Sequence, residues 1–227
     1  MSEIAEISAS TVPTLANAVE LFKVVPPNTG FTRAPMTCHF PAFGMCAGYA
    51  VTVHARTDQP AAGLDEPAYW KWLESRPGPK IVVVEDLDPT PGGAMWGEWN
   101  ANVHLALGCV GTVTEGAVRD LDALERLGFH AFATSVSVAH GYGVFVDYDQ
   151  PVTVAGLPVA TGDLVVADQH GVLKIPPAIP VGELVEVARE IDRLEAEIFT
   201  YCQAPGFSVD GLADLQRSVE SRWPHPR

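Results

Sequence analysis

Apolar and polar positions alternate along this chain with two distinct periods. Several segments repeat apolar residues every three or four positions, which predicts amphipathic helices. Others are short, apolar and β-branched or alternate with a period of two, which predicts strands. The predicted helices are 11–22, 66–75, 98–107, 120–127 and 181–202. The predicted strands are 48–55, 81–85, 109–114 and 130–134.

The order of these elements predicts the fold class. Strands and helices alternate between residues 81 and 134, as they do in the βα units of a parallel sheet. Residues 151–176 read as β-structure interrupted by glycine turns, and the tail after 202 reads as a short helix with a frayed end. No internal repeat or clean linker is visible. We therefore expect a single α/β domain over residues 1–227, part βα units and part antiparallel β, with a helical tail at 181–227.

The composition narrows the partners. The chain has 227 residues, 47% of them hydrophobic, and 14 basic against 28 acidic residues give a net charge of −14. This charge argues against nucleic acid and anionic membranes as partners, because phosphate binding needs a basic surface. It is compatible with a small anionic substrate, since one Arg can hold a carboxylate. No apolar run approaches the roughly 20 residues of a membrane helix, and no basic region followed by an apolar stretch opens the chain, so we expect a cytoplasmic protein.

The four cysteines, Cys38, Cys46, Cys109 and Cys202, show neither CxxC spacing nor the density of a disulfide scaffold. We expect reduced, mostly buried thiols. A zinc site on Cys38 and Cys46 would lack a second ligand pair and is disfavoured.

Candidate chemistry begins in the loop before the 98–107 helix, which contains Gly92, Gly93 and Gly97. Glycines let a backbone approach a ligand closely, and a helix N-terminus offers unpaired N–H groups to a carboxylate. The loop has neither of the common phosphate-binding glycine patterns, and a simple tight turn is the alternative.

Twenty residues separate Glu98 from the pair Arg119 and Asp120. In consecutive βα units the loops at the carboxyl ends of the strands are neighbours, so these side chains can converge. Asp is a hard ligand for Mg²⁺ or Mn²⁺, and Arg can bind a carboxylate through two hydrogen bonds. The alternative is that Asp120 caps the helix starting at residue 121 and Arg119 is solvated.

One segment carries a family resemblance, WGEWNANVHLALGCVGTVTEGAVRDLDALERLGFHAFA. It resembles the core signature of the RraA-like family, and the likeness continues through PVTVAGLPVATGDLVVADQHGVLKIP and loosely through STVPTLANAV, covering roughly residues 10 to 200. The family includes class II 4-hydroxy-4-methyl-2-oxoglutarate/4-carboxy-4-hydroxy-2-oxoadipate aldolases, related oxaloacetate decarboxylases and RraA, a regulator of ribonuclease E. Some members have been labelled demethylmenaquinone methyltransferases, a label that no methyl-donor site supports here.

The resemblance implies a fold and an assembly. The fold is a three-layer β/β/α sandwich akin to the swivelling phosphohistidine domain. The assembly is a homotrimer or a dimer of trimers with the active site between subunits.

The resemblance also implies residue roles. Asp120 would ligate the divalent metal, Mg²⁺ or Mn²⁺, and Arg119 would bind the 2-oxo acid near its keto and carboxylate oxygens. Backbone amides from Gly97 to Asn100, with Trp99 between them, would hold the carboxylate. Glu98 would order a metal-bound water that acts in proton transfer.

Other residues are less closely matched to the family. Glu197 is a possible counterpart of an acid that the family's aldolases take from an adjacent subunit. The departures from the family pattern are Trp99, Asn100, Asn102 and His104 in the helix after the glycines and Asn17 near the start. These departures leave the identity of the substrate open.

The leading hypothesis is a divalent-metal-dependent lyase that cleaves a small 2-oxo acid to pyruvate, by retro-aldol cleavage or by decarboxylation of oxaloacetate. One alternative is a non-catalytic RraA-type regulator that binds an RNA-degrading enzyme. Another is altered chemistry that uses His140, in SVSVAHGYG, or His170, in ADQHGV, as acid or base. Each histidine can instead be satisfied by hydrogen bonds in a turn.

Overall fold

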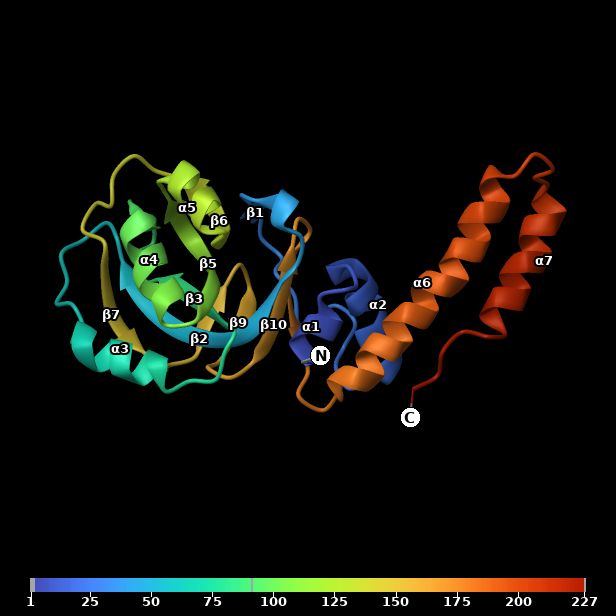
Figure 1. Cartoon of the computed structure of the whole chain (residues 1–227), viewed down its shortest axis with the longest axis horizontal. Helices are drawn as coiled ribbons and strands as arrows, with labels where there is room; N and C mark the ends of the chain where they lie inside the picture. Colours follow the sequence, from blue (N-terminus) through green and yellow to red (C-terminus); the bar gives the residue numbers. More distant parts are fainter. Residues whose placement is uncertain (1–2, 91, 227) are drawn as a thin grey trace. The chain divides into compact units, whose positions relative to one another are not determined.

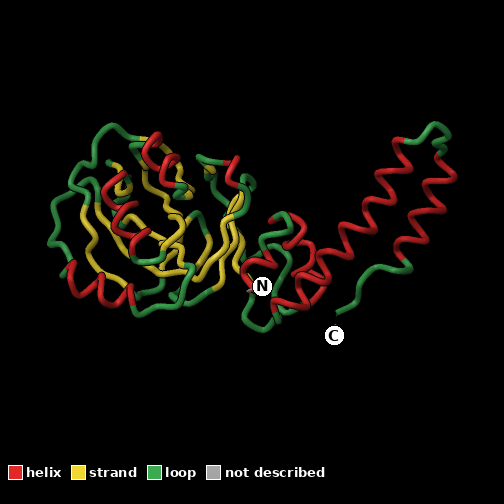
Figure 2. Tube along the Cα trace, viewed as in Figure 1, coloured by secondary structure: helices red, strands yellow, loops and turns green. Residues whose placement is uncertain are grey.

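The computed structural model describes residues 3–90 and 92–226, which form two compact units. One unit is residues 28–177, and the other combines the two ends of the chain, up to Pro27 and from Ala178. Figure 2 shows that the strands belong to the first unit and that the second is helical. No helix among the described residues combines the length and apolarity needed to cross a membrane.

The 28–177 unit is built on a nine-stranded sheet (Figure 1). Its strands are β1 (Thr37–Cys38), β2 (Cys46–Arg56), β3 (Lys80–Asp86), β4 (Ala94–Trp96), β5 (Cys109–Val118), β6 (His130–Val136), β7 (Val144–Tyr148), β10 (Leu164–Asp168) and β11 (Gly171–Ile175). The order is β1-β6-β5-β3-β2-β10-β11, with β4 paired to β5 and β7 paired to β2. The centre, β2-β3-β5-β6, is parallel, whereas β10 runs antiparallel to β2 and to β11. The sheet therefore mixes βα units with antiparallel hairpins, as the sequence predicted.

Both faces of this sheet are covered. The helices on one face are α3 (Glu66–Glu74), α4 (Glu98–Ala106) and α5 (Leu121–Leu127), and the hairpin on the other is β8 (Val152–Val154) with β9 (Leu157–Val159). Alternate residues of β3 face the two layers: Val82 and Val84 pack in the cluster under the helices, Ile81 and Val83 in the cluster under the hairpin. The continuous apolar run of β3 is therefore buried on both faces of the sheet. The result is the expected three-layer β/β/α sandwich.

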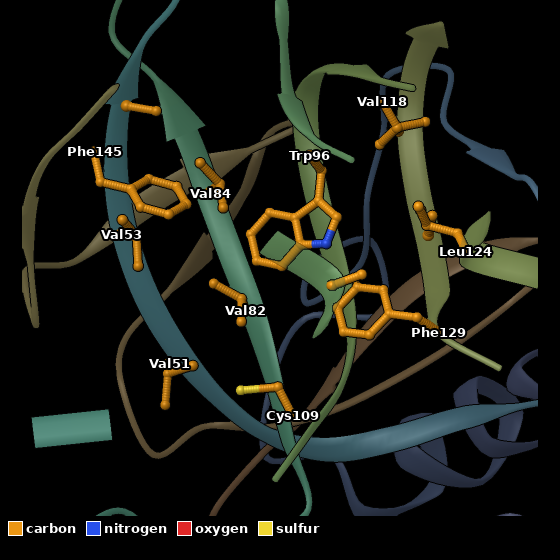
Figure 3. Close-up of a cluster of buried hydrophobic side chains, with 14 of the residues drawn as sticks. Val51, Val53, Val82, Val84, Trp96, Cys109, Val118, Leu124, Phe129 and Phe145 are labelled. Atoms are coloured by element: carbon orange, nitrogen blue, oxygen red, sulfur yellow. The ribbon is translucent and has the colours of Figure 1, made fainter. Parts of the chain in front are cut away.

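The cluster under the helices centres on Trp96 at the end of β4 (Figure 3). Its ring stacks on Phe129, with centroids 5.6 Å apart and an interplanar angle of 13°. Burying rings of this size stabilises the fold by a few kcal/mol each, about 25 cal/mol per Å² of apolar surface. Gly97, the first residue of the candidate site, follows Trp96 directly. The packing of Trp96 in the core therefore also fixes the backbone at the start of that site.

The helical unit consists of α1 (Glu3–Ile7), α2 (Val12–Phe22), α6 (Val181–Gln203) and α7 (Val209–Glu220). The buried side of α6 is Leu184, Val185, Ala188, Ile191 and Leu194. Thr14 on α2 donates a hydrogen bond to the Asp192 carboxylate on α6 at 3.0 Å. The side that α6 buries is the apolar stripe at helical spacing that the sequence predicted.

Every predicted helix and strand is present, with bounds that agree within two residues except at the end of β5, which continues to Val118 where the prediction stopped at 114. The helix α7 accounts for the one expected in the tail. Three strands of the nine-stranded sheet were missed, β1, β4 and β7, and so was the short helix α1. β4 is three residues long inside a loop rich in glycine and proline, and it exists because it pairs with β5. Local pattern cannot reveal a strand whose stability comes from a partner far along the chain.

Candidate active site

Two parallel strands place the glycine loop beside the Arg–Asp pair. Trp96 at the end of β4 is in register with Val118 at the end of β5, and the Arg119 N–H donates to the Trp96 carbonyl at 2.8 Å. Gly97 and Arg119 therefore leave the sheet next to one another. The convergence of the two loops follows from this register.

Asp120 joins the loops through its side chain. Its Oδ2 accepts a hydrogen bond from the Glu98 N–H at 3.0 Å and lies 3.6 Å from Arg119 Nε. Its backbone is left-handed, with φ 55°, and its side chain makes no capping bond to α5. The capping alternative is therefore wrong: the carboxylate caps the first turn of α4 instead. The Glu98 carboxylate turns elsewhere, with Oε1 3.7 Å from Arg126 Nη2.

Gly97 is the point of closest approach. A Cβ at this position would lie 2.5 Å from Asp120 Oδ2 and 3.0 Å from Arg119 Cγ. Its φ is −155°, an ordinary extended conformation. Glycine is thus needed here for space, so that Asp120 and Arg119 can close over the helix start.

The first turn of α4 keeps two amides available. The Ala101 N–H bonds to the Gly97 carbonyl and the Glu98 N–H bonds to Asp120, but within the described residues no acceptor is recorded for the Trp99 and Asn100 N–H groups. Unpaired amides at a helix N-terminus carry positive potential and suit a carboxylate.

A cavity of about 200 Å³ adjoins this turn. It is lined by Ala94, Met95, Gly97, Trp99, Asn100, Arg119, His140 and Gly143. The structure thus brings His140 to the same cavity as Arg119, whereas Glu98 and Asp120 do not line it. Asp120 stays adjacent to it through Arg119.

The position of His140 is set by its backbone neighbours. The Ala94 N–H donates to the Ala139 carbonyl at 2.9 Å, and the Tyr142 N–H donates to the Thr57 carbonyl at 2.9 Å. A Cβ on Gly93 would come within 2.3 Å of the His140 carbonyl oxygen. The glycine loop therefore holds the histidine loop by close backbone packing, which side chains would block.

A buried hydrogen-bonded chain lies beneath α4. His104 Nδ1 lies 2.7 Å from the Asn100 carbonyl, and His104 Nε2 lies 2.9 Å from the Tyr69 hydroxyl on α3. A carbonyl only accepts, so Nδ1 carries the proton and the Tyr69 hydroxyl donates to Nε2. Burial lowers the pKa of His104 to about 4, partly offset by the bond to Asn100, and burial raises the pKa of Tyr69. Both groups stay neutral at pH 7 and tie α3 to α4.

Asp120 is the acid that this site offers to a divalent metal. Within residues 3–90 and 92–226, no three His, Cys, Asp or Glu side chains gather as a metal-binding group. Asp120 offers a carboxylate whose Oδ2 is positioned by Glu98 N–H, while no hydrogen bond to Oδ1 is recorded among the described residues. One carboxylate fits Mg²⁺ or Mn²⁺, because Mg²⁺ keeps several waters and takes one or two protein carboxylates plus substrate oxygens. The residues present therefore fit such an ion.

Two other predicted residues are held by local partners. His170 is in the turn between β10 and β11. Its backbone N and its Nδ1 lie 2.8 and 3.1 Å from Asp168 Oδ1. The structure therefore favours the alternative in which this histidine is satisfied by hydrogen bonds in a turn. Glu197 is on α6 in the helical unit, where Arg193 and Arg222 bind its carboxylate at 2.9 and 2.8 Å.

The cysteines are all free, as expected. Burial raises the pKa of the Cys109 thiol to about 12, with Lys80 opposing the shift, and burial also raises the pKa of Cys46. These two thiols are unreactive packing residues.

A second cavity of about 480 Å³ contains residues that the sequence did not single out. It is lined by Gly63, Leu64, Asp65, Glu66, Pro67, Met95, Trp99, Asn100, Gly143, Val144 and Phe145. Asp65 and Glu66 read in the sequence only as the start of a helix. The local sequence pattern did not indicate that the start of α3 faces the loop before α4.

The comparisons with known proteins establish the family of the chain. The model of the RraA-like family, described as Aldolase/RraA, matches residues 8–173, and the chain belongs to this family. A protein of Halalkalibacterium halodurans with the provisional name 4-hydroxy-4-methyl-2-oxoglutarate aldolase is 29% identical over 160 residues, covering 65% of this chain and 75% of the relative. One of Hahella chejuensis with the same provisional name is 28% identical over 144 residues, covering 63% and 82%.

Solved structures share the fold. An uncharacterized protein from Pseudomonas syringae pv. tomato superposes with a TM-score of 0.72 at 21% identity, covering 95% of this chain and 93% of that one. Streptomyces coelicolor RraAS2, described as an unusual member of the RNase ES inhibitor RraA protein family, superposes with a TM-score of 0.66 at 21% identity, covering 87% and 94%. At this identity the likeness establishes the fold alone.

Proposed function

We propose that this chain is an aldolase-type lyase that releases pyruvate from a small 4-hydroxy-2-oxo acid, with a divalent metal held at Asp120. The observation that carries the proposal is the junction of Asp120 and Arg119 at the start of α4, where the Asp120 carboxylate accepts the Glu98 N–H. The provisional aldolase names of the two relatives support the same reaction class. A protein that acts only by masking a partner has no need of this junction.

The substrate's pyruvate half would lie in the 200 Å³ cavity. The Arg119 guanidinium binds the C1 carboxylate and faces the C2 keto oxygen, and the Trp99 and Asn100 amides donate to the remaining carboxylate oxygen. When bound, Mg²⁺ or Mn²⁺ would withdraw electron density from the keto group. Arg119 then stabilises the negative charge that develops on that oxygen as the bond breaks.

Retro-aldol cleavage also needs a base for the C4 hydroxyl. The base takes the hydroxyl proton, C4 becomes a carbonyl carbon, and the electron pair of the C3–C4 bond passes to the pyruvate enolate, which is then protonated at C3. His140 lines the cavity, and Glu98 belongs to the helix turn between the lining residues Gly97 and Trp99 although its carboxylate lies near Arg126. We propose His140 as one candidate for this role and Glu98, acting through a water, as the other. Oxaloacetate decarboxylation needs no such base, so we expect it as a side activity.

The test is pyruvate release from 4-hydroxy-4-methyl-2-oxoglutarate and from oxaloacetate, with Mg²⁺ and with EDTA. We expect turnover that disappears with EDTA and falls at least about 100-fold in Asp120→Ala, because the carboxylate both positions the helix start and holds the ion. Asp122→Ala is the matched control, since Asp122 is an exposed acid two residues along. It should retain activity.

The same assay separates the two bases. Loss of aldol cleavage but not of decarboxylation in His140→Gln assigns the proton transfer to His140, and the same split in Glu98→Gln assigns it to Glu98. Absence of turnover above the metal-only background on either acid would contradict the lyase and favour the protein-binding alternative.

A further inference from the structure

The cavity that holds Arg119 continues into the larger one. The 200 and 480 Å³ cavities share four lining residues, Met95, Trp99, Asn100 and Gly143. A ligand whose pyruvate half lies at Arg119 therefore extends past Trp99 and Asn100 toward the start of α3. The far cavity is where the portion of the substrate beyond C4 would lie.

Positive and negative side chains lie at opposite ends of this path. Among the described residues that line either cavity, Arg119 is the only Lys or Arg, and it lies at the near end. The far end carries Asp65 and Glu66. Asp65 caps α3, with Oδ1 accepting the Ala68 N–H at 3.1 Å, and Glu66 is in the first turn. Two carboxylates at this helix start offset its positive end, so the α3 end of the far cavity disfavours a second anionic group.

The side-chain oxygens of the far cavity, on Asp65, Glu66 and Asn100, are acceptors. The Asn100 side chain donates one N–H to the Met95 carbonyl at 2.7 Å, and its amide oxygen remains an acceptor for a ligand. The Leu64 N–H is already bonded to the Phe145 carbonyl at 2.9 Å. Hydroxyl groups donate to such acceptors, whereas a carboxylate cannot.

Trp99 adds a flat apolar face to the same path. Its side chain is 74% exposed, although it is a large aromatic residue at the start of α4 and lines both cavities. An exposed aromatic ring next to hydrogen-bond acceptors suits a carbon chain that presents C–H groups to the ring and O–H groups to the oxygens.

We propose that the preferred substrate is a monocarboxylate: a 4-hydroxy-2-oxo acid whose distal portion, beyond C4, is a neutral hydroxylated chain and carries no second carboxylate. This inference rests on the proposed lyase function and names its substrate class. Cleavage of such an acid balances without an added oxidant or reductant. The C4 hydroxyl loses its proton, the C3–C4 bond breaks, and the products are pyruvate and a neutral hydroxyaldehyde.

The test compares two acids of equal length, 4,5-dihydroxy-2-oxopentanoate and 4-hydroxy-2-oxoglutarate, which differ in a hydroxymethyl against a carboxylate at C5. With Mg²⁺ present, we expect kcat/KM to be at least about tenfold higher for the dihydroxy acid. Glu66→Arg should reverse much of this preference by raising kcat/KM for 4-hydroxy-2-oxoglutarate about tenfold, because a cation then faces the second carboxylate. Glu74→Arg makes the same charge change at the exposed end of the same helix and should leave the preference unchanged.

Calorimetric titration of each acid into the protein with Mg²⁺ separates this inference from the lyase itself. Tighter binding of the dihydroxy acid without turnover would overturn the lyase and support the substrate class. Turnover with equal or higher kcat/KM for 4-hydroxy-2-oxoglutarate would overturn the substrate class and support the lyase. If Glu74→Arg shifts the preference as much as Glu66→Arg does, the effect comes from net charge and the inference is overturned. If neither acid binds, both the lyase function and the substrate class are overturned.

Discussion

At the scale of single residues, the candidate site depends on two glycines, because a side chain at either position would not fit. Gly97 and Gly93 both lie where a Cβ would collide with the opposite loop, in one case with Asp120 and Arg119 and in the other with the His140 backbone. The three-glycine loop was correctly marked by the sequence as a place of close approach, but what approaches is another part of the same chain. Close backbone packing of this kind positions side chains within tenths of an ångström, which is the precision that catalysis needs.

Gly97→Ala tests this requirement. Its extended φ tolerates a Cβ, so the fold should persist with a melting temperature within a few degrees of wild type, but displacement of Asp120 and Arg119 should lower kcat/KM by about 100-fold. The measurements are thermal unfolding by circular dichroism and pyruvate release. Gly182→Ala is the control, because nothing lies within 4 Å of a Cβ there. Unchanged kcat/KM in Gly97→Ala would show that the closure of Asp120 over α4 is irrelevant to activity.

At the scale of elements, two helices on one face of the sheet set the size of the cavities. The start of α3 lines the larger cavity and the start of α4 lines both. Between them, the bond from Tyr69 to His104 is the buried polar link, and Trp96 packs against the His104 ring with centroids 4.7 Å apart. In the sequence, His104 appeared only as a departure from the family pattern. Its role in linking two helices depends on a tyrosine 35 residues away.

The link between α3 and α4 predicts a specific loss of stability in acid. The folded pKa of His104 is about 4 and its ordinary value is 6.5, so the unfolded chain takes up a proton first as the pH falls. The contribution of the neutral imidazole is complete above about pH 6.5 and is lost progressively down to about pH 4, amounting to about 3 kcal/mol. Urea unfolding across this range should show a steeper fall in unfolding free energy for wild type than for His104→Gln.

The control for this measurement is His225→Gln, which removes an exposed histidine near the end of the chain. Its curve should run parallel to that of wild type. His39 and His130, whose pKa values are also lowered by burial, are common to all three proteins and do not affect the difference. Parallel curves for wild type and His104→Gln would contradict the assignment of a buried neutral imidazole.

At the scale of the whole molecule, charge and architecture constrain the partners. The chain carries −14 overall, while the cavity lining contains one arginine. A local arginine and free helix amides can bind a small carboxylate in spite of the surrounding charge, because these contacts are short and partly desolvated. A polyanion, by contrast, would meet the whole acidic surface.

We therefore expect no binding of single-stranded RNA or duplex DNA in fluorescence-anisotropy titrations at physiological ionic strength. The titration should be repeated at low salt, where any phosphate-binding patch is strengthened. Binding that grows stronger as salt is lowered would contradict this expectation and show a basic patch that the net charge conceals. A basic protein of similar size, titrated in parallel, verifies that the assay detects such binding.

The elements that the sequence alone determined are those with a strong local pattern. The apolar run of β3, the periodic stripe of α6 and the glycine that ends α5 are physical properties of a few neighbouring residues, and the structure contains each of them. The proximity of Glu98 to the Arg119–Asp120 pair was also accessible, because parallel strands bring successive loops to one edge of a sheet.

Tertiary structure alone decided what the loops face. The three-residue β4 forms only by pairing with β5, the Asp120 carboxylate turns to α4 although its position in the sequence suggests a cap for α5, and Asp65 and Glu66 reach the cavity because α3 packs beside α4. These outcomes depend on contacts between residues from 20 to 80 positions apart along the chain, roughly the spacing of successive elements in an α/β fold. Local propensity carries no information about such contacts, since their free energy is realised only when the layers pack.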